Sequence, residues 1–149
     1  MESKSLKVSW IILAIIQCFH IIAGLITIIF PQVFVANKFQ LMANQQWSAF
    51  MASSPQVSSY ISILSSAEGL FVFTSALAHL FIILFAYRKG EKWAWYVSLV
   101  ITTIGHIGSI VENINIGDMG IVIVDIITLV ISYGALALAA KALLGKGSA

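Results

Sequence analysis

The stretch MGIVIVDIITLVISYGALALAA, residues 119–140, contains a single charged side chain, Asp125. An α-helix needs about 20 predominantly apolar residues to cross the hydrocarbon core of a bilayer. Because no water is present there to satisfy the backbone, a continuous apolar run of this length forms a helix with internal hydrogen bonds. The stretch therefore predicts a transmembrane helix.

Three further stretches of the same kind precede it, at about residues 8–30, 60–87 and 93–111. The whole chain is 60% hydrophobic and 9% charged, whereas a soluble domain carries about 25% charged residues. This composition excludes a soluble globular domain, a disordered chain, a coiled coil and a disulfide scaffold. The runs are continuous and do not alternate, which excludes the strands of a membrane barrel. We therefore predict an all-α, polytopic membrane protein, with one four-helix bundle domain over residues 1–149.

Basic residues divide unequally between the two ends of these helices. With four spans, both termini and the connection at 88–92 lie on one side, and that side holds seven of the eight lysines and arginines. The seven are Lys4, Lys7, Arg88, Lys89, Lys92, Lys141 and Lys146. The positive-inside rule then predicts that both termini are cytoplasmic. A cleaved signal peptide is the alternative for residues 8–30, although that apolar run exceeds the usual 7–15 residues.

The first external connection, residues 31–57, is long and contains Lys38, the remaining basic residue. Within it the aromatic side chains Phe39, Trp47 and Phe50 mix with several asparagines and glutamines. A short helix lying in the headgroup plane uses such a mixture, and a loop packed over the bundle is the alternative. We expect the short interfacial helix.

The second connection, RKGEKWAWY at residues 88–96, predicts a tight basic turn. Gly90 permits the turn, and we expect Trp93, Trp95 and Tyr96 to anchor at the membrane interface. The pattern R-x-G-x-x-W-A-W, together with the four-span layout, resembles the inner turn of small four-helix membrane proteins of the DoxX-like group. The resemblance implies the fold and carries no functional residue.

Each predicted span supplies one ionisable side chain in its outer half or near its middle: His20, Glu68, His106 and Asp125. At 1.5 Å per residue, each lies roughly 9–15 Å from the outer end of its helix. An ionised residue near a helix centre costs about 2.5–3.5 kcal/mol on insertion scales, so such residues face the bundle interior and are functional candidates. We therefore expect the four side chains to converge on one lipid-shielded pocket.

Each span also carries a polar stripe at helical spacing. The stripes are Gln17-His20-Gly24-Thr27, Ser65-Glu68-Ser75-His79, Thr102-His106-Ser109-Asn113 and Asp125-Thr128-Ser132. His79, in the inner half, is either a core histidine or the inner end of a relay from Glu68. The small-residue pairs Gly105/Ser109 and Ala135/Ala139 predict close helix contacts.

Several functions suit imidazoles and carboxylates that meet inside a membrane. Coupled groups of this kind suit a proton relay, or a carrier that binds a small ligand, an ion or a proton. They also suit a zinc, iron or manganese site, with His20, His106, Glu68 and Asp125 as candidate ligands. In a small enzyme acting on a lipid-like substrate, Glu68 and Asp125 would be the acid/base candidates. A purely structural polar core, in an accessory or assembly subunit, is the remaining interpretation.

The sequence specifies no cofactor. It contains no His-Glu-x-x-His or Glu-x-x-His motif, no nucleotide-binding loop and no nucleic-acid-binding motif. Cys18 is the single cysteine, and we expect it to be a small buried apolar side chain. Four helices leave little room for a wide solute path, which favours a homo-oligomer or membership of a larger membrane complex, surrounded by membrane lipids.

Overall fold

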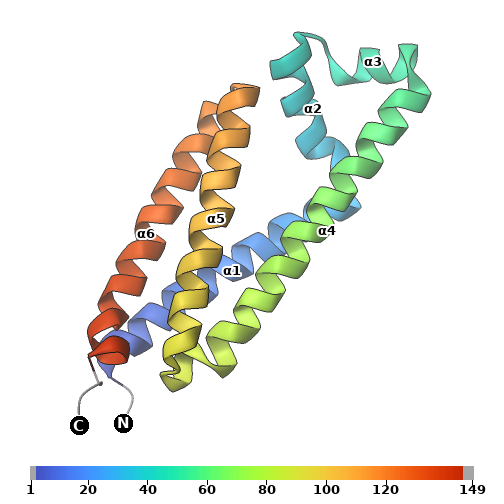
Figure 1. Ribbon diagram of the computed structural model, residues 1–149. Coiled ribbons are helices and arrows are strands. Elements are labelled where there is room, and N and C mark those ends of the chain that lie inside the picture. Colours follow the sequence, from blue (N-terminus) through green and yellow to red (C-terminus); the bar gives the residue numbers. More distant parts are fainter. Residues whose placement is uncertain (1–2, 146–149) are drawn as a thin grey trace.

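A computed structural model describes residues 3–145, and within that range every regular element is helical. The elements are α1 (Lys4–Ile29), α2 (Pro31–Ala43), α3 (Trp47–Ser53), α4 (Pro55–Phe85), the 3-10 turn η1 (Tyr87–Lys89), α5 (Lys92–Ile116) and α6 (Met119–Leu144) (Figure 1). Four segments, namely α1, α4 with η1, α5 and α6, are long and apolar enough to cross a membrane. The predicted all-α class and the four candidate spans are confirmed, and composition indicates a multi-pass membrane protein.

The helices extend beyond the predicted spans, because an apolar run stops at the first polar residues whereas a helix continues until the backbone is broken. Helix α4 begins at Pro55, with proline in its first turn, and not at residue 60. Helix α5 continues past residue 111 and ends where Gly117 adopts a φ of 87°. Only glycine adopts this left-handed conformation without a steric penalty.

Side chains at the helix ends pair with backbone N–H groups that the helices leave without an internal partner. The Ser3 hydroxyl accepts a hydrogen bond from the Leu6 amide at 3.2 Å and caps α1. The Asp118 carboxylate caps α6 in the same way, accepting from the Ile121 amide at 3.2 Å. Gly90, with a φ of 88°, makes the predicted tight turn before α5.

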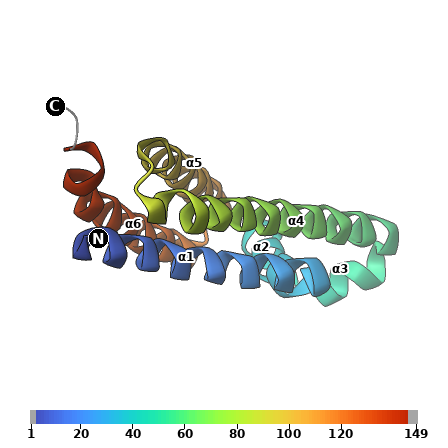
Figure 2. The same cartoon turned by 90° about the horizontal axis from the view of Figure 1, so that it is seen from below.

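The helices form two antiparallel pairs. Helices α1 and α4 lie side by side in the view from below (Figure 2), and α5 and α6 form a hairpin (Figure 1). The start of α1, the end of α6 and the α4–α5 turn lie at one end of the molecule, which we call the basic end (Figure 1). Its basic residues in the described range are Lys4, Lys7, Arg88, Lys89, Lys92 and Lys141, and Lys146 lies outside that range. The opposite end, with α2, α3 and the α5–α6 turn, is called the loop end.

The closest helix crossing joins α1 to α4 through two glycines. A Cβ atom on Gly24 would lie 2.7 Å from the backbone nitrogen of Phe73, and one on Gly69 would lie 2.8 Å from the Cβ of Thr27. Real Cβ atoms do not approach other atoms this closely, so any larger residue would force the helices apart. The crossing therefore depends on glycine at both positions.

Only one of the two predicted small-residue contacts is present. Ala135 and Ala139 are fully buried in the core, as expected. A Cβ atom on Gly105 would meet no atom within 4 Å, so the prediction of a close contact there is wrong. Gly105 has the right spacing, but its side of α5 is open.

A hydrophobic core fills the basic end, where α1, α4, α5 and α6 meet. Its largest members include Leu13, Ile83, Tyr87 and Leu136, all fully buried. Two polar contacts join the helices there: Ser9 hydrogen-bonds Tyr87 through their hydroxyls at 2.7 Å, and the Trp95 indole nitrogen donates to the Leu136 carbonyl at 2.9 Å. The Trp95 indole N–H therefore bonds α6, and the anchoring of Trp95 at the membrane interface stays a prediction.

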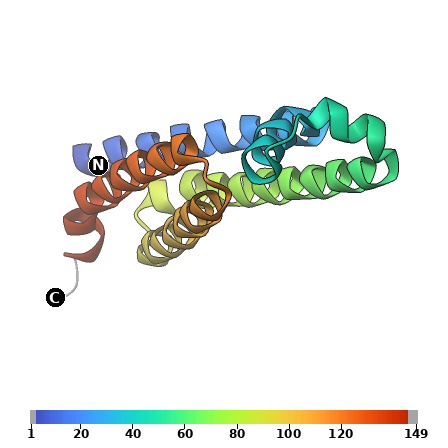
Figure 3. The same cartoon turned by 90° about the horizontal axis from the view of Figure 1, so that it is seen from above.

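Towards the loop end α4 diverges from α5, and α2 occupies the wedge between them (Figures 1 and 3). The connection expected to hold one short helix thus contains two, α2 and α3. Phe39 of α2 packs against Trp47 and Phe50 of α3, with ring centres 5.2 and 4.6 Å away. An aromatic cluster therefore joins α2 to α3.

The polar stripes mostly face inward. Gln17, His79, His106 and Asn113 are all buried. Cys18, by contrast, is exposed on α1, so its predicted burial is wrong. Neighbouring residues in a helix point about 100° apart. Because Gln17 points inward, Cys18 points away from the interior.

Replacing either crossing glycine by alanine should destabilise the protein. Gly24→Ala and Gly69→Ala should each cost about 1–3 kcal/mol, the usual effect of overpacking, measured as the free energy of unfolding in mixed micelles by circular dichroism. Gly105→Ala is the matched control, because it adds the same methyl group to open space. Equal losses in all three variants would contradict this account of the crossing.

Candidate functional site

The central polar contact joins α5 to α6. His106 Nδ1 lies 3.3 Å from Asp125 Oδ1, and the two side chains are only 7% and 13% exposed. Because a carboxylate can only accept, the imidazole N–H is the donor in this hydrogen bond. The structure therefore brings together two of the four ionisable residues singled out in the sequence.

Neighbouring side chains of α5 support the carboxylate. The Ser109 hydroxyl donates to Asp125 Oδ2 at 2.6 Å, so each carboxylate oxygen of Asp125 has a donor. Asn113 in turn donates through Nδ2 to the Ser109 carbonyl at 2.9 Å and to the Ser109 hydroxyl at 3.2 Å. These contacts fix the orientation of Asp125 towards α5.

Two more histidines extend this group to the other pair of helices. The ring of His20, from α1, lies 5.5 Å from that of His106 between centres. His79, from α4, is 1% exposed and close enough to His20 to interact with it electrostatically. We call His20, His79, His106 and Asp125 the histidine cluster; it draws one side chain from each candidate span.

Glu68 does not join the histidine cluster, so the expectation of one pocket for all four predicted residues is corrected. Its carboxylate accepts a hydrogen bond from Lys38 Nζ at 3.0 Å, and Lys38 also donates to Glu112 at 2.8 Å. Glu68 lies eleven residues from His79 on α4, roughly 16 Å along the helix axis. Helix α4 therefore contributes His79, and not Glu68, to the histidine cluster.

Lys38 bridges α2 to both α4 and α5 at the loop end. Burial of Lys38 disfavours its charged form, but the hydrogen bonds to Glu112 and Glu68 outweigh that effect and raise the pKa of Lys38. A raised lysine pKa means that the bridge stays charged at neutral pH and is lost only as the pH rises through the raised value. The bridge holds α2 in the wedge between α4 and α5.

His79 stands out because neither ring nitrogen has a hydrogen-bond partner in the described part of the chain. The Ser98 hydroxyl and Asn113 Oδ1 are also buried and have no hydrogen-bond partner among the described residues. A buried polar group left unpaired costs about 1–3 kcal/mol. The interior between the helices thus retains unused donors and acceptors beside the histidine cluster.

The candidate metal ligands do not form one ligand set. Within residues 3–145, no three side chains of His, Cys, Asp or Glu are grouped so that they could hold a metal ion. His20, His106 and Asp125 approach one another, whereas Glu68 is engaged by Lys38. Among the described residues the arrangement is one hydrogen-bonded pair, His106–Asp125, with the His20 ring beside it.

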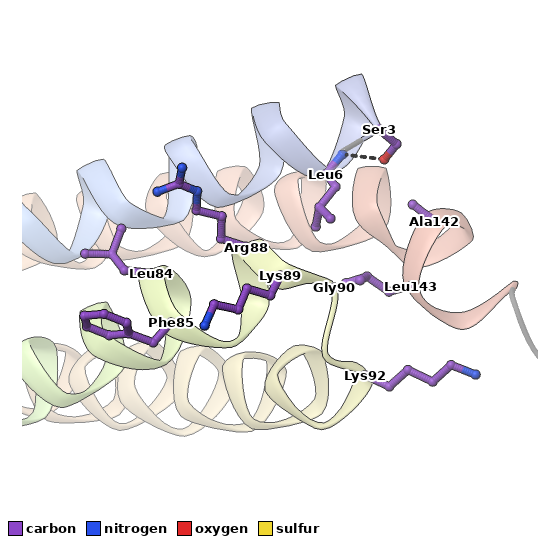
Figure 4. A pocket seen from close by; sticks show the side chains of 10 residues that line it. All are labelled: Ser3, Leu6, Leu84, Phe85, Arg88, Lys89, Gly90, Lys92, Ala142 and Leu143. Atoms are coloured by element: carbon purple, nitrogen blue, oxygen red, sulfur yellow. Dashed lines mark hydrogen bonds between the residues drawn. The ribbon is translucent and has the colours of Figure 1, made fainter. Parts of the chain in front are cut away.

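Two cavities lie away from the histidine cluster. One, of about 530 Å³, opens at the loop end around Lys38, Glu68 and Glu112. The other, of about 940 Å³, lies at the basic end, where Arg88 and Lys89 flank apolar side chains including Phe85 (Figure 4). Arg88 also lies over the ring of Trp10, 5.1 Å from its centre. The cavity at the basic end contains none of the candidate site residues in its described lining.

Comparison with protein-family models, curated proteins and solved structures finds no match for this chain. The resemblance of the 88–95 turn to the DoxX-like group therefore stays a prediction. The site must be interpreted from its own chemistry.

Sequence reasoning missed Lys38 and Glu112 as members of a polar site. A signal was present: Lys38 is the one basic residue on its side of the predicted spans, while Glu68, Glu112 and Asp118 supply acidic groups near that side. A lone cation near several carboxylates in a low-dielectric setting is expected to pair with them.

The contact between His106 and Asp125 should be measurable as a coupling energy. In a double-mutant cycle of His106→Ala and Asp125→Asn, we expect the double variant to lose less stability than the sum of the single losses. Polar contacts between membrane helices average about 0.6 kcal/mol and reach about 1.7 kcal/mol. The same unfolding measurement with His106→Ala and Thr128→Val is the control, because the Thr128 hydroxyl bonds its own helix. Equal coupling in both cycles would contradict a specific pair.

Proposed function

We propose that this chain is a multi-pass membrane protein, with both termini in the cytoplasm, that binds a proton inside the bilayer and relays it along the histidine cluster. One observation carries the proposal: a hydrogen-bonded His106–Asp125 pair is continued by His20 and His79, so that all four candidate spans contribute a proton-exchanging group. An imidazole can accept a proton on one nitrogen and release it from the other. A series of such groups is therefore suited to passing protons.

The spacing of charged residues along α4 and α5 supports a position inside the membrane for the histidine cluster. Glu68 and Arg88 are twenty residues apart on α4 and η1, and Lys92 and Glu112 are twenty apart on α5. At 1.5 Å per residue each interval is about 30 Å, the thickness of a hydrocarbon core. His79 and His106 lie between these levels, which supports their being surrounded by the membrane.

Features at both ends of the molecule are consistent with the same placement in the membrane. Helix α3 runs across the direction of α5 and α6 (Figure 1), and with its aromatic cluster it suits the interfacial position expected from the sequence. The cationic cavity at the basic end suits anionic lipid headgroups on the cytoplasmic side. A chain with only four membrane helices has little interior room, which favours assembly into a homo-oligomer or a larger membrane complex.

Proton movement can be tested in sealed vesicles that contain the purified protein and a pH-sensitive dye. Under an imposed membrane potential, we expect wild-type protein to acidify or alkalinise the lumen faster than protein-free vesicles. Asp125→Asn should reduce the rate to that background, because the amide cannot exchange a proton in the same range, and His106→Ala should do likewise.

Thr128→Val is the matched control, because Thr128 lies one turn from Asp125 on the same helix and its hydroxyl donates to the Val124 carbonyl of that helix. It should leave the flux unchanged. Undiminished flux in a folded Asp125→Asn variant would contradict the relay. An unstable Asp125→Asn variant, with no flux from wild type above background, would favour the purely structural core instead.

Orientation can be tested by labelling single cysteines in intact cells with a membrane-impermeant maleimide, in a Cys18→Ala background. Gln45→Cys, between α2 and α3, should react from outside because the loop end is predicted to be external. Glu91→Cys, in the turn at the basic end, should react only after permeabilisation. The opposite pattern would contradict cytoplasmic termini.

A further inference from the structure

The cavity at the loop end has the composition of a small-molecule site. It lies between α2, α4 and α5 and has a volume of about 530 Å³. Ligand sites are typically about 300–1,000 Å³, mostly apolar, with a few polar groups. The apolar lining includes Val35, Phe39, Met42, Ile61, Leu64 and Ile116. Its charged groups are Lys38, Glu68 and Glu112.

The three charged groups leave an excess of negative charge. Lys38 Nζ engages one oxygen of each glutamate, Oε1, at 3.0 Å from Glu68 and 2.8 Å from Glu112. The second oxygen of each carboxylate has no hydrogen-bond partner among residues 3–145, and both side chains are 49% exposed. One ammonium faces two carboxylates, so the lining attracts a further cation with hydrogen atoms to donate.

The shape and chemistry of the lining select the kind of cation. A divalent metal ion needs several oxygen ligands, whereas Lys38 already stands between the two carboxylates and the remaining walls are apolar apart from Ser65. Those walls suit an apolar tail, and the two free carboxylate oxygens suit an ammonium group with N–H donors. A quaternary ammonium has no such donor.

We propose that this cavity binds an amphiphile with a primary ammonium headgroup. The ammonium donates to the free oxygens of Glu68 and Glu112, and the apolar tail lies along Phe39, Leu64 and Ile116. The site is separate from the histidine cluster and shares no residue with it. Proton relay and amphiphile binding can therefore succeed or fail independently.

Binding can be measured with the full chain in phosphatidylcholine nanodiscs titrated with decylammonium, after subtraction of binding to empty nanodiscs. We expect saturable binding that is stronger than that of decyltrimethylammonium or decanol. Glu68→Gln and Glu112→Gln should each weaken decylammonium binding about tenfold, the effect of losing one charge-assisted hydrogen bond. Both amides can still accept from Lys38, so α2 should remain in place.

Glu91→Gln is the matched control, because it removes a carboxylate at the basic end and should leave the affinity unchanged. Leu64→Trp fills the cavity without changing its charge, and the folded variant should lose binding. Wild-type affinity in both glutamine variants, full binding by folded Leu64→Trp, or equal binding of decanol and decylammonium would each overturn the proposal.

The ammonium could come from a free amphiphilic amine or from a lipid headgroup, and a second set of nanodiscs distinguishes the two. Phosphatidylethanolamine in the bilayer should compete with decylammonium if the headgroup of that lipid is the natural occupant. Undiminished decylammonium binding in those nanodiscs assigns the site to a free amine.

Discussion

Hydrocarbon offers no hydrogen-bond partner to a polar side chain, and the packing of this protein follows from that constraint. The hydroxyls of Thr74 and Thr128 donate to the carbonyl one turn earlier in the same helix, so neither side chain needs a partner from another helix. The His106–Asp125 pair cannot be satisfied locally, so each residue requires the neighbouring helix. Polar residues therefore decide which helices must meet, while apolar residues fill the space between them.

The packing changes along the length of the molecule. At the basic end, interhelical hydrogen bonds and a buried hydrophobic core join the four long helices. Towards the loop end, the α1–α4 crossing at Gly24 and Gly69 directs α4 away from α5, and α2 enters the wedge. There the ion pairs of Lys38 with Glu68 and Glu112 join α2 to α4 and α5, whereas apolar packing joins the helices at the basic end. The histidine cluster lies between these two regions, where the helices begin to diverge.

The sequence was sufficient for the helical class, the four candidate spans and the gathering of basic residues at one end, because these depend on composition and on the order of apolar runs and charged residues along the chain. It also predicted that His20, His106 and Asp125 approach one another, because the cost of a charge in hydrocarbon directs such residues towards the bundle interior. It misplaced Glu68, since spacing along a helix fixes a face but not the tilt of that helix. Glu68 and His79 share a stripe on α4, yet the stripe is long enough to reach two different sites.

Unpaired polar atoms support the direction in which a relay from the cluster would continue. Within the described residues, the buried groups without a hydrogen-bond partner include both ring nitrogens of His79 and the hydroxyl of Ser98. His79 is ten residues from Lys89, and Ser98 is six from Lys92, roughly 15 and 9 Å from the basic end along their helices. Both lie between the His106–Asp125 pair and the basic end, where the polar groups of Ser9, Tyr87 and Trp95 are already hydrogen-bonded. A polar interior group is tolerated when a partner reaches it at least part of the time, so this is the region through which a proton would leave the cluster.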